Sequence, residues 1–230
     1  MNSNILNKLY SSDPLFQALR DRIVSGEYPP GTILSEKDLT KEFKVSRTPY
    51  REALRQLENL KLVRIVPRFG TYVSEIDIPE IMNAYEVRLR LETMAVELAT
   101  KRRGEKDLSD LKAVIEEIEK WEINNGDPTA AGALDACMHE IVCKASGNSV
   151  LMETVCSLRL ICGRIWTSRW RKNYDFQKLI SDWIIIYESI ESSDTQRASE
   201  AMADHIQDSM NALKKSIFGH EDLSNGGGDL

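Results

Sequence analysis

The stretch "SEKDLTKEFKVSRTPYREALRQLENLKLVRIVPRFGTYV", residues 35–73, constrains the fold more than any other part of the chain. Two segments with the apolar spacing of helices, 35–43 and 46–60, are separated only by the short turn "KVS". Runs of β-branched residues then flank "PRFG", a pattern that predicts a two-stranded hairpin. Two closely spaced helices followed by a hairpin predict a winged helix-turn-helix.

Capping residues set the expected helix starts in this region. Asp13 followed by Pro14 predicts the start of a preceding helix that ends at Gly26. Ser35 and Ser46 occupy the positions where a side-chain oxygen caps the next two helices. The sequence "PPGTIL" is expected to form a turn and a short extended piece between the first two helices.

After Ile76 the strand signals disappear and helical periodicity takes over. Six helices are expected, at about 78–102, 105–123, 128–146, 149–172, 175–192 and 194–218. The predicted fold class is therefore mostly α, with an N-terminal winged helix-turn-helix and a C-terminal all-α bundle that binds a ligand. We expect three regions: a DNA-binding domain at 1–76, an effector-binding and dimerisation domain at 77–218, and a disordered tail at 219–230.

Charge is distributed unevenly between the two halves. Residues 1–76 carry 12 Lys/Arg and 9 Asp/Glu, whereas residues 77–230 carry 18 and 27. The first part is therefore suited to a polyanion, which the acidic remainder would repel. No run of about 18 apolar residues and no secretory signal occurs, so we expect a cytoplasmic protein without a membrane partner.

Cysteine usage argues against a disulfide framework and a structural zinc site. The four cysteines, at 137, 143, 156 and 162, contain no CxxC pair. They are expected to be reduced thiols in helices, since free cysteine is commonly a core residue.

The third helix carries the strongest signal for DNA binding. Arg47, Arg51 and Arg55 recur every four residues on one face, while Leu54 and Leu57 lie on the other. A basic face at the start of a helix is typical of a recognition helix in the major groove, where arginine bonds guanine. From periodicity alone, a solvated charged helix is the alternative.

Other residues near this helix are candidates for phosphate or base contacts. Ser46 and Thr48 lie at its first turn, Lys37 opens the preceding helix, and Arg68 lies at the tip of the hairpin. Lys37 and Arg68 thus flank the recognition helix as expected phosphate clamps.

The chain resembles the GntR family of bacterial transcription regulators in three motifs. These are I-x-x-G-x-x-P-P-G-x-x-L, V-S-R-x-P-x-R-E-A-L-x-x-L and the G-T-x-V of the wing, all present between residues 23 and 73. The resemblance implies that Arg47, Arg51 and residues 68–70 contact operator DNA. Gly70 also has a local reason, since a tight wing turn against the backbone of DNA leaves no room for a Cβ. Lys44 stands where the family usually has glycine, so we expect a left-handed backbone there.

Residues 77–218 resemble the helical FCD domain of the FadR-like branch of that family. The matching pieces are "YEVRLRLETMAVELAT", "DACMHEIVCKASGN" and "SEAMADHIQDSM". The resemblance implies that Arg88 lines an effector cavity and that Asp135, His139 and His205 bind a divalent metal and a small carboxylate. Without the resemblance, the four-residue spacing of Asp135 and His139 indicates only two polar side chains on the exposed face of a helix.

The family's remaining metal ligand is a histidine, and this sequence has Trp183 there, after Asp182. Because an indole cannot ligate a metal, zinc, nickel or manganese is expected at low occupancy or not at all. Trp183 is expected to be an apolar wall of the effector pocket. Among the arginines of the fourth bundle helix, Arg164 is expected to face the cavity, and the others to be solvated or dimer-facing.

Three functions are compatible with these patterns. The leading hypothesis is a dimeric transcription regulator that binds a palindromic operator and responds to a carboxylate or sugar-acid effector, with no catalytic activity. The alternatives are a metal-dependent hydrolytic enzyme and a constitutive DNA-binding protein whose bundle only dimerises. Dimerisation follows because one winged motif contacts few base pairs, and "IIIY", residues 184–187, is the expected apolar surface for it.

Overall fold

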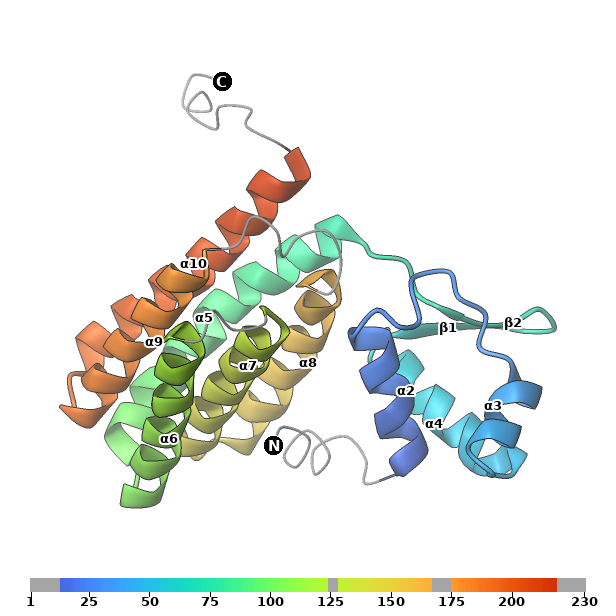
Figure 1. Cartoon of the computed structure of the whole chain (residues 1–230), viewed down its shortest axis with the longest axis horizontal. Helices are drawn as coiled ribbons and strands as arrows, with labels where there is room; N and C mark the ends of the chain where they lie inside the picture. Colours follow the sequence, from blue (N-terminus) through green and yellow to red (C-terminus); the bar gives the residue numbers. More distant parts are fainter. Residues whose placement is uncertain (1–12, 124–127, 167–174, 219–230) are drawn as a thin grey trace.

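The computed structural model describes residues 13–123, 128–166 and 175–218, so the predicted tail at 219–230 lies outside the described residues. It confirms the predicted fold class: a helical chain with one two-stranded antiparallel sheet, arranged as two groups of elements (Figure 1). The first group, the winged-helix unit, contains α2 (Pro14–Val24), α3 (Glu36–Glu42), α4 (Arg47–Asn59), β1 (Val63–Val66) and β2 (Gly70–Val73). The second, the helical bundle, contains α5 (Ile78–Arg102), α6 (Glu105–Ile123), α7 (Pro128–Ala145), α8 (Ser149–Trp166), α9 (Phe176–Glu191) and α10 (Thr195–Phe218).

The winged-helix unit has a hydrophobic core of its own. Apolar side chains from all three helices and both strands form one cluster, which includes Phe16, Leu19, Leu54, Leu57 and Val63. Leu54 and Leu57 are buried as the amphipathic pattern of the third helix predicted. Burial of this cluster fixes α4 with its basic face outward.

Two of the three predicted helix caps are present. Asp13 accepts a hydrogen bond from the amide of Leu15, and Ser35 accepts one from the amide of Asp38. The predicted cap at Ser46 is wrong, because its side chain makes no capping hydrogen bond. A capping oxygen normally accepts from the second or third amide of the helix, and the third residue here is Pro49, which has no N–H.

The wing is a short hairpin extended by one further bridge. Val63 pairs with Val73 and Val66 with Gly70, and Ile33 bridges to Tyr72 from the extended piece before α3. Gly70 has φ +135°, and the nearest atom to an added Cβ would be 3.9 Å away. Within the chain, glycine is favoured at position 70 because of its positive φ, and not because a Cβ would be crowded by neighbouring atoms.

The turn between α3 and α4 has the backbone that was expected from its sequence. Lys44 has φ 54°, the left-handed conformation predicted for this departure from the family's glycine. Arg68 at the wing tip is also left-handed, with φ 69°.

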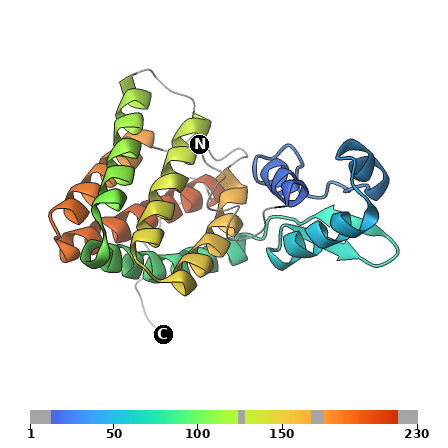
Figure 2. The ribbon, with the colours of Figure 1, turned by 90° about the horizontal axis from the view of Figure 1, so that it is seen from below.

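The six bundle helices lie close to their predicted bounds. α5 and α6 begin and end where predicted, α7 and α10 differ by one residue at one end, and α9 differs by one residue at both ends. α8 is described to Trp166, and the rest of its predicted length lies outside the described residues. α5 packs against α7, α8 and α10, and α10 also packs against α9, so α5 lies centrally among these helices (Figures 1 and 2).

The bundle core corrects the expectation about residues 184–187. Ile186 is fully buried and Tyr187 nearly so, whereas Ile184 is half-buried and Ile185 is 37% exposed. The helical period turns two of the four side chains inward. The segment is therefore mostly a core element, and the prediction that it forms an apolar surface is wrong.

The cysteines behave as their spacing predicted. All four are free, three are buried and Cys137 is half-buried. Burial raises the pKa of the Cys143 thiol well above its ordinary value. These thiols are therefore protonated and poorly nucleophilic near neutral pH.

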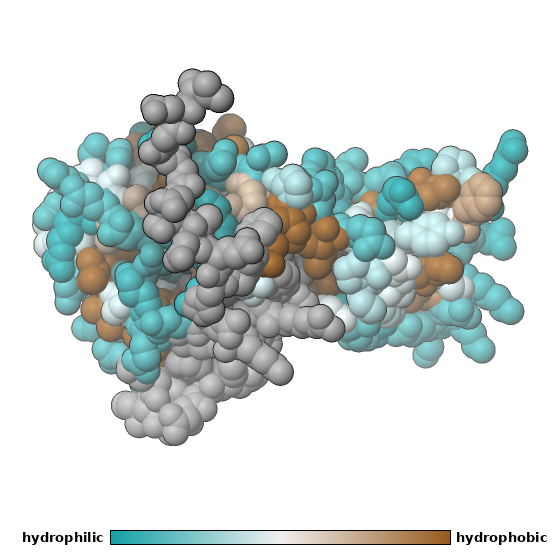
Figure 3. All heavy atoms as spheres, turned by 90° about the horizontal axis from the view of Figure 1, so that it is seen from above, coloured by the Kyte–Doolittle hydropathy of each residue, from teal (hydrophilic) through white to brown (hydrophobic). Residues whose placement is uncertain are grey.

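The two groups of elements meet at three places. Residues 74–77 connect β2 to α5, Lys61 forms an ion pair with Glu80 at the start of α5, and α2 lies against α8. Figure 3 shows hydrophobic residues gathered between the bundle and the winged-helix unit, and hydrophilic residues projecting from the far end of that unit. The connection between the two groups is short, and α8 lies directly against the winged-helix unit.

Candidate functional site

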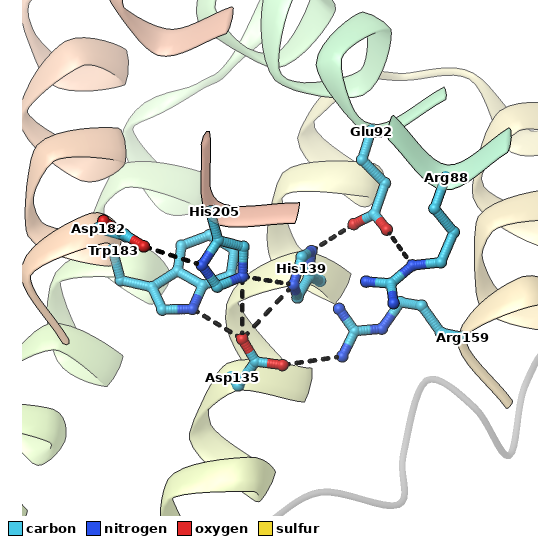
Figure 4. A network of polar contacts seen from close by, with 8 residues as sticks. All are labelled: Arg88, Glu92, Asp135, His139, Arg159, Asp182, Trp183 and His205. Atoms are coloured by element: carbon cyan, nitrogen blue, oxygen red, sulfur yellow. Dashed lines mark hydrogen bonds and ion pairs between the residues drawn. The ribbon is translucent and has the colours of Figure 1, made fainter. Parts of the chain in front are cut away.

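A cluster of polar side chains lies inside the helical bundle (Figure 4). We call it the buried polar cluster. Its members are Arg88 and Glu92 from α5, Asp135 and His139 from α7, Arg159 from α8, Asp182 and Trp183 from α9, and His205 from α10. Charged groups are costly in an apolar interior unless they are paired, so the pairing of each member is informative.

Three atoms converge at the centre of the cluster. The Nε2 atoms of His139 and His205 lie 3.5 and 3.3 Å from Oδ1 of Asp135, and 3.2 Å from each other. The fold thus brings His205 from α10 beside the Asp135–His139 pair of α7. Both histidines are almost completely buried. The interpretation of Asp135 and His139 as an exposed polar pair on a helix is therefore wrong.

The three converging atoms have the spacing of metal ligands. Ligand atoms about 2.0–2.1 Å from a tetrahedral zinc ion lie roughly 3.3 Å from one another. Asp135, His139 and His205 offer one atom each, and their separations fall around that value. Within the described part of the chain, these residues therefore fit a three-ligand metal site.

A carboxylate lies near the Nδ1 atom of each histidine. Glu92 contacts Nδ1 of His139, and Asp182 lies 3.6 Å from Nδ1 of His205. A carboxylate at Nδ1 favours a proton on that nitrogen and turns Nε2 toward the centre. Glu92 was not singled out from the sequence, although its i+4 relation to Arg88 was a visible signal.

Burial and neighbouring charge shift the pKa values of the cluster. Burial, followed by the positive charge of Arg159, lowers the pKa of His139. For His205, burial acts in the same direction but is outweighed by hydrogen bonds with Asp135 and Asp182, so its pKa is raised. Burial acts to raise the pKa of Asp135, but His139, His205 and Arg159 outweigh it and hold this pKa well below its usual range.

Trp183 closes the remaining side of Asp135. Its indole is fully buried, and Nε1–H donates to Oδ1 of Asp135 at 2.9 Å. Its rings lie 4.6 Å from His139, edge-on, and 4.9 Å from His205. The expectation of a purely apolar wall is therefore wrong, because Trp183 is a hydrogen-bond donor to the oxygen that the two histidines share.

The cluster contains two arginines that differ in pairing, Arg88, which is buried, and Arg159, which is partly buried. Nε of Arg88 donates to Glu92 at 2.7 Å, while Nη2 of Arg159 lies 3.4 Å from Oδ2 of Asp135. Arg164, the arginine of α8 that was expected to face this site, has a side chain outside the described residues. Arg159, five residues earlier on α8, was expected to contact solvent or a dimer partner, and it points into the cluster instead (Figure 4).

A second candidate site lies on the exposed face of α4. Nε of Arg47 lies 3.0 Å, and that of Arg51 3.5 Å, from the carboxylate of Glu36 on α3. Both arginines remain largely exposed, at 81% and 64%. Glu36, which sequence analysis missed, therefore aligns the two side chains without removing them from solvent.

The other predicted DNA-contacting residues lie around this face. Ser46 and Thr48 are exposed at the start of α4, Lys37 is exposed on α3, and Arg68 and Gly70 are exposed at the wing tip. All five are thus accessible to a polyanion.

An exposed basic helix within a winged unit, joined to a bundle with a buried polar site, defines a DNA-binding regulator with a sensing domain. Comparisons with known proteins agree. Residues 12–73 match the model for bacterial regulatory proteins of the gntR family, and residues 83–208 match the FCD domain. The chain belongs to the GntR family of bacterial transcription regulators and carries its FCD domain.

Relatives match most of the chain. The gluconate operon transcriptional repressor of Bacillus subtilis is 29% identical over 216 residues, covering 90% of this chain and 87% of the relative. The HTH-type transcriptional repressor RspR of Escherichia coli is 23% identical over 201 residues, covering 87% and 88%. The curated relatives are thus named as transcription regulators.

Solved structures support the fold. The E. coli protein McbR/YncC superposes with a TM-score of 0.77 at 20% identity, covering 88% of this chain and 96% of that one. A GntR regulator from Rhodococcus gives a TM-score of 0.67 at 21% identity, covering 87% and 96%. Among the described helices, none is long and apolar enough to cross a membrane.

Glu92 provides a stability prediction. Glu92→Gln removes the negative charge between Arg88 and His139, and breaking a buried ion pair costs about 3–5 kcal/mol. We expect the free energy of unfolding, measured by urea denaturation at pH 7, to fall by about that amount. Because the pKa of Glu92 is lowered by Arg88 and His139 against its burial, its contribution is complete above the unfolded-state pKa of about 4.3. The difference between wild type and variant should shrink as the pH falls below that value.

The matched control is Glu188→Gln, which removes an exposed ion pair with Arg197 at 3.0 Å. Exposed pairs of this kind contribute about 0–1 kcal/mol. Equal losses in the two variants would show that the Arg88–Glu92–His139 contacts do not stabilise the bundle.

Proposed function

We propose that this chain is a ligand-responsive transcription regulator that binds a palindromic operator as a homodimer in the cytoplasm, without catalytic activity. The observation that carries the proposal is the combination of two features. One is the exposed pair Arg47 and Arg51 on α4, held by Glu36. The other is a buried polar cluster in a bundle whose helices α5 and α8 adjoin the winged-helix unit.

The DNA contacts divide into base readers and phosphate contacts. Arg47 and Arg51 enter the major groove and bond guanine O6 and N7, since their guanidinium groups are exposed and project from the start of α4. Ser46 and Thr48 contact phosphates or base edges beside them. Lys37, together with Arg68 and Gly70 at the wing tip, contacts the backbone on either side.

Dimerisation is part of this proposal. A single winged-helix unit reads only a few base pairs, and two-fold pairing supplies the affinity needed against competing genomic DNA. The helical bundle is the proposed seat of the dimer contact, and a palindromic operator mirrors its symmetry.

The effector is proposed to be a small organic acid, of the simple carboxylate or sugar-acid type. It occupies the buried polar cluster, where Arg88, Asp135, His139, His205 and Trp183 supply its hydrogen bonds. Arg164, near the described end of α8, is the further residue proposed from the sequence. Two Bacillus relatives named as gluconate operon repressors support this ligand class.

A divalent ion such as zinc, nickel or manganese would be held by Asp135, His139 and His205, which have the required spacing. Its charge would polarise a bound acid group. We propose that such an ion is bound weakly, because the indole N–H of Trp183 stands beside Asp135 where a fourth ligand is absent.

The first test concerns DNA recognition. Arg47→Ala or Arg51→Ala should weaken binding to a palindromic site, selected by the wild-type protein from random DNA, by about 1–3 kcal/mol. Lys37→Ala should weaken binding to all sequences and flatten the dependence on salt, since it removes a phosphate contact. Fluorescence anisotropy at several salt concentrations measures both effects. Unchanged affinity in both arginine variants would refute the assignment of α4 as the recognition helix.

The second test concerns communication between the two parts. An effector changes DNA affinity only if it binds two arrangements of the protein unequally. Ile76 packs against the bundle, so several Gly-Ser residues inserted between Glu75 and Ile76 lengthen the connection outside the core. We expect this variant to retain ligand binding and to lose the effect of ligand on DNA affinity. If the ligand still changes DNA affinity in the variant, the connection is not the route.

The third test concerns the metal. Trp183→His restores an imidazole at the fourth position and should raise the metal affinity of the purified protein by at least about tenfold. Trp183→Phe is the matched control, because it removes the indole N–H without adding a ligand. Elemental analysis after dialysis against a chelator measures the metal retained by each protein. One chelator-resistant ion per wild-type chain would show that three ligands suffice and that the weak-metal proposal is mistaken.

A further inference from the structure

Arg159 has unused hydrogen-bonding capacity inside the bundle. Its side chain is 18% exposed, and its Nη1 atom is buried without a hydrogen-bond partner among the described residues. Its contact with Oδ2 of Asp135, at 3.4 Å, is long for a charge-assisted hydrogen bond, which is usually about 2.7–2.9 Å. A guanidinium group has five N–H donors, and the two on Nη1 of Arg159 are unused among the described residues.

The neighbours of Arg159 are already committed elsewhere. Asp135 accepts a 2.9 Å bond from Trp183 on Oδ1, and both histidines share that oxygen. Arg88, which is buried, is paired with Glu92 at 2.7 Å. Arg159, which is partly buried, is therefore the arginine of the cluster that is more available to an incoming group.

The carboxylates of the cluster are balanced by cations. The three carboxylates of the cluster face three cations: Glu92 pairs with Arg88, Asp182 with Lys178, and Asp135 with Arg159. The formal charges of these three pairs balance, and Glu140 is a further carboxylate that interacts with Arg159 from α7. Figure 4 shows the guanidinium of Arg159 beside that of Arg88, on the side of Asp135 away from Trp183.

We propose that Arg159 is the residue that binds the acid group of the effector, through two parallel N–H···O bonds from its guanidinium group. The inference rests on the proposed function and adds to it a specific anchor on α8. It requires a ligand with a free carboxylate that replaces the long contact between Arg159 and Asp135. The planar fork of arginine matches a carboxylate, which the point charge of lysine does not.

The test compares acids with their uncharged counterparts. Wild-type protein is titrated with gluconate and with glucitol, and with lactate and propane-1,2-diol, at constant ionic strength, by calorimetry and thermal shift. The same titrations are made with Arg159→Met, Arg159→Lys and, as the exposed control, Arg90→Met. Arg90 lies on the outer face of α5, so its loss leaves the cluster intact. Urea denaturation confirms that each variant is folded.

We expect at least one acid to bind wild type and Arg90→Met with the same affinity, while its alcohol binds far more weakly. Arg159→Met should lose on the order of tenfold or more of the acid's affinity, and its discrimination between acid and alcohol should fall in proportion. Arg159→Lys should be intermediate, because it retains the charge without the fork. Loss of affinity for acid and alcohol alike would indicate a merely structural role and overturn the proposal.

Two other outcomes also overturn the inference and are distinguishable. Unchanged acid binding in folded Arg159→Met would refute the role of Arg159 and leave the effector site standing. Failure of every acid to bind the wild-type protein would refute both the anchor and the ligand class. Binding of the selected DNA site by the same preparation would then show that the DNA-binding part of the proposed function survives. If Arg159→Met does not fold, the affinity ratio between wild type and Arg159→Lys decides, and a ratio near one refutes the proposal.

Discussion

The buried polar cluster of the helical bundle is organised around the partly buried carboxylate of Asp135. An isolated carboxylate in a low-dielectric interior is costly, and removing its partners leaves that cost unmet. Its partners here come from α7 itself, from α8, α9 and α10, and α5 contributes through Glu92 behind His139. Packing of these helices is therefore coupled to the hydrogen-bonding state of a single side chain. A ligand or ion that engages Asp135 changes the balance among four helices at once.

Trp183 distinguishes this cluster from a site with four metal ligands, because its indole N–H donates a hydrogen bond to Asp135. The indole N–H makes the shortest hydrogen bond to Asp135, so the carboxylate is satisfied by protein groups alone. The arrangement of His139 and His205 keeps the spacing of a metal site, while the tryptophan fills the side where the family resemblance places a further imidazole. Arg159 has a buried Nη1 without a hydrogen-bond partner among the described residues, and it lies on α8, which adjoins α2 of the winged-helix unit. A contact made with Arg159 thus acts on the helix that touches the DNA-binding part of the chain.

Much of the fold was predictable from the sequence because its signals are local. Apolar periodicity and helix-breaking residues placed all six bundle helices, and the turn at Lys44 was correctly assigned a left-handed backbone. The predicted cap at Ser46 is absent, because Pro49, the third residue of α4, has no N–H to donate to the Ser46 hydroxyl. The prediction of an apolar surface at 184–187 is wrong, because four consecutive apolar residues carry no information on which faces of a helix are covered.

The candidate site was less accessible from the sequence. Asp135 and His139 stand one helical turn apart in the sequence, but His205 and Trp183 were joined to them only through family resemblance, since their separation in sequence exceeds any local pattern. The hydrogen bond from Trp183, the contact of Glu92 with His139 and the orientation of Arg159 depend on how five helices pack. Similarly, no periodicity relates Glu36 on α3 to the arginines of α4 that it aligns. Such contacts between elements are set by tertiary structure and become visible only there.

The central claim is that occupancy of the buried polar cluster by a small organic acid changes the affinity of the winged-helix unit for DNA. The most direct measurement is the affinity of the wild-type protein for its selected palindromic site, by fluorescence anisotropy, with and without saturating concentrations of a panel of small organic acids. The account predicts that at least one acid changes this affinity by about 5–150-fold, the usual range of allosteric coupling. An acid that binds the protein yet leaves DNA affinity unchanged, with no other acid of the panel altering it, would contradict the account and identify a DNA-binding protein that does not respond to such ligands.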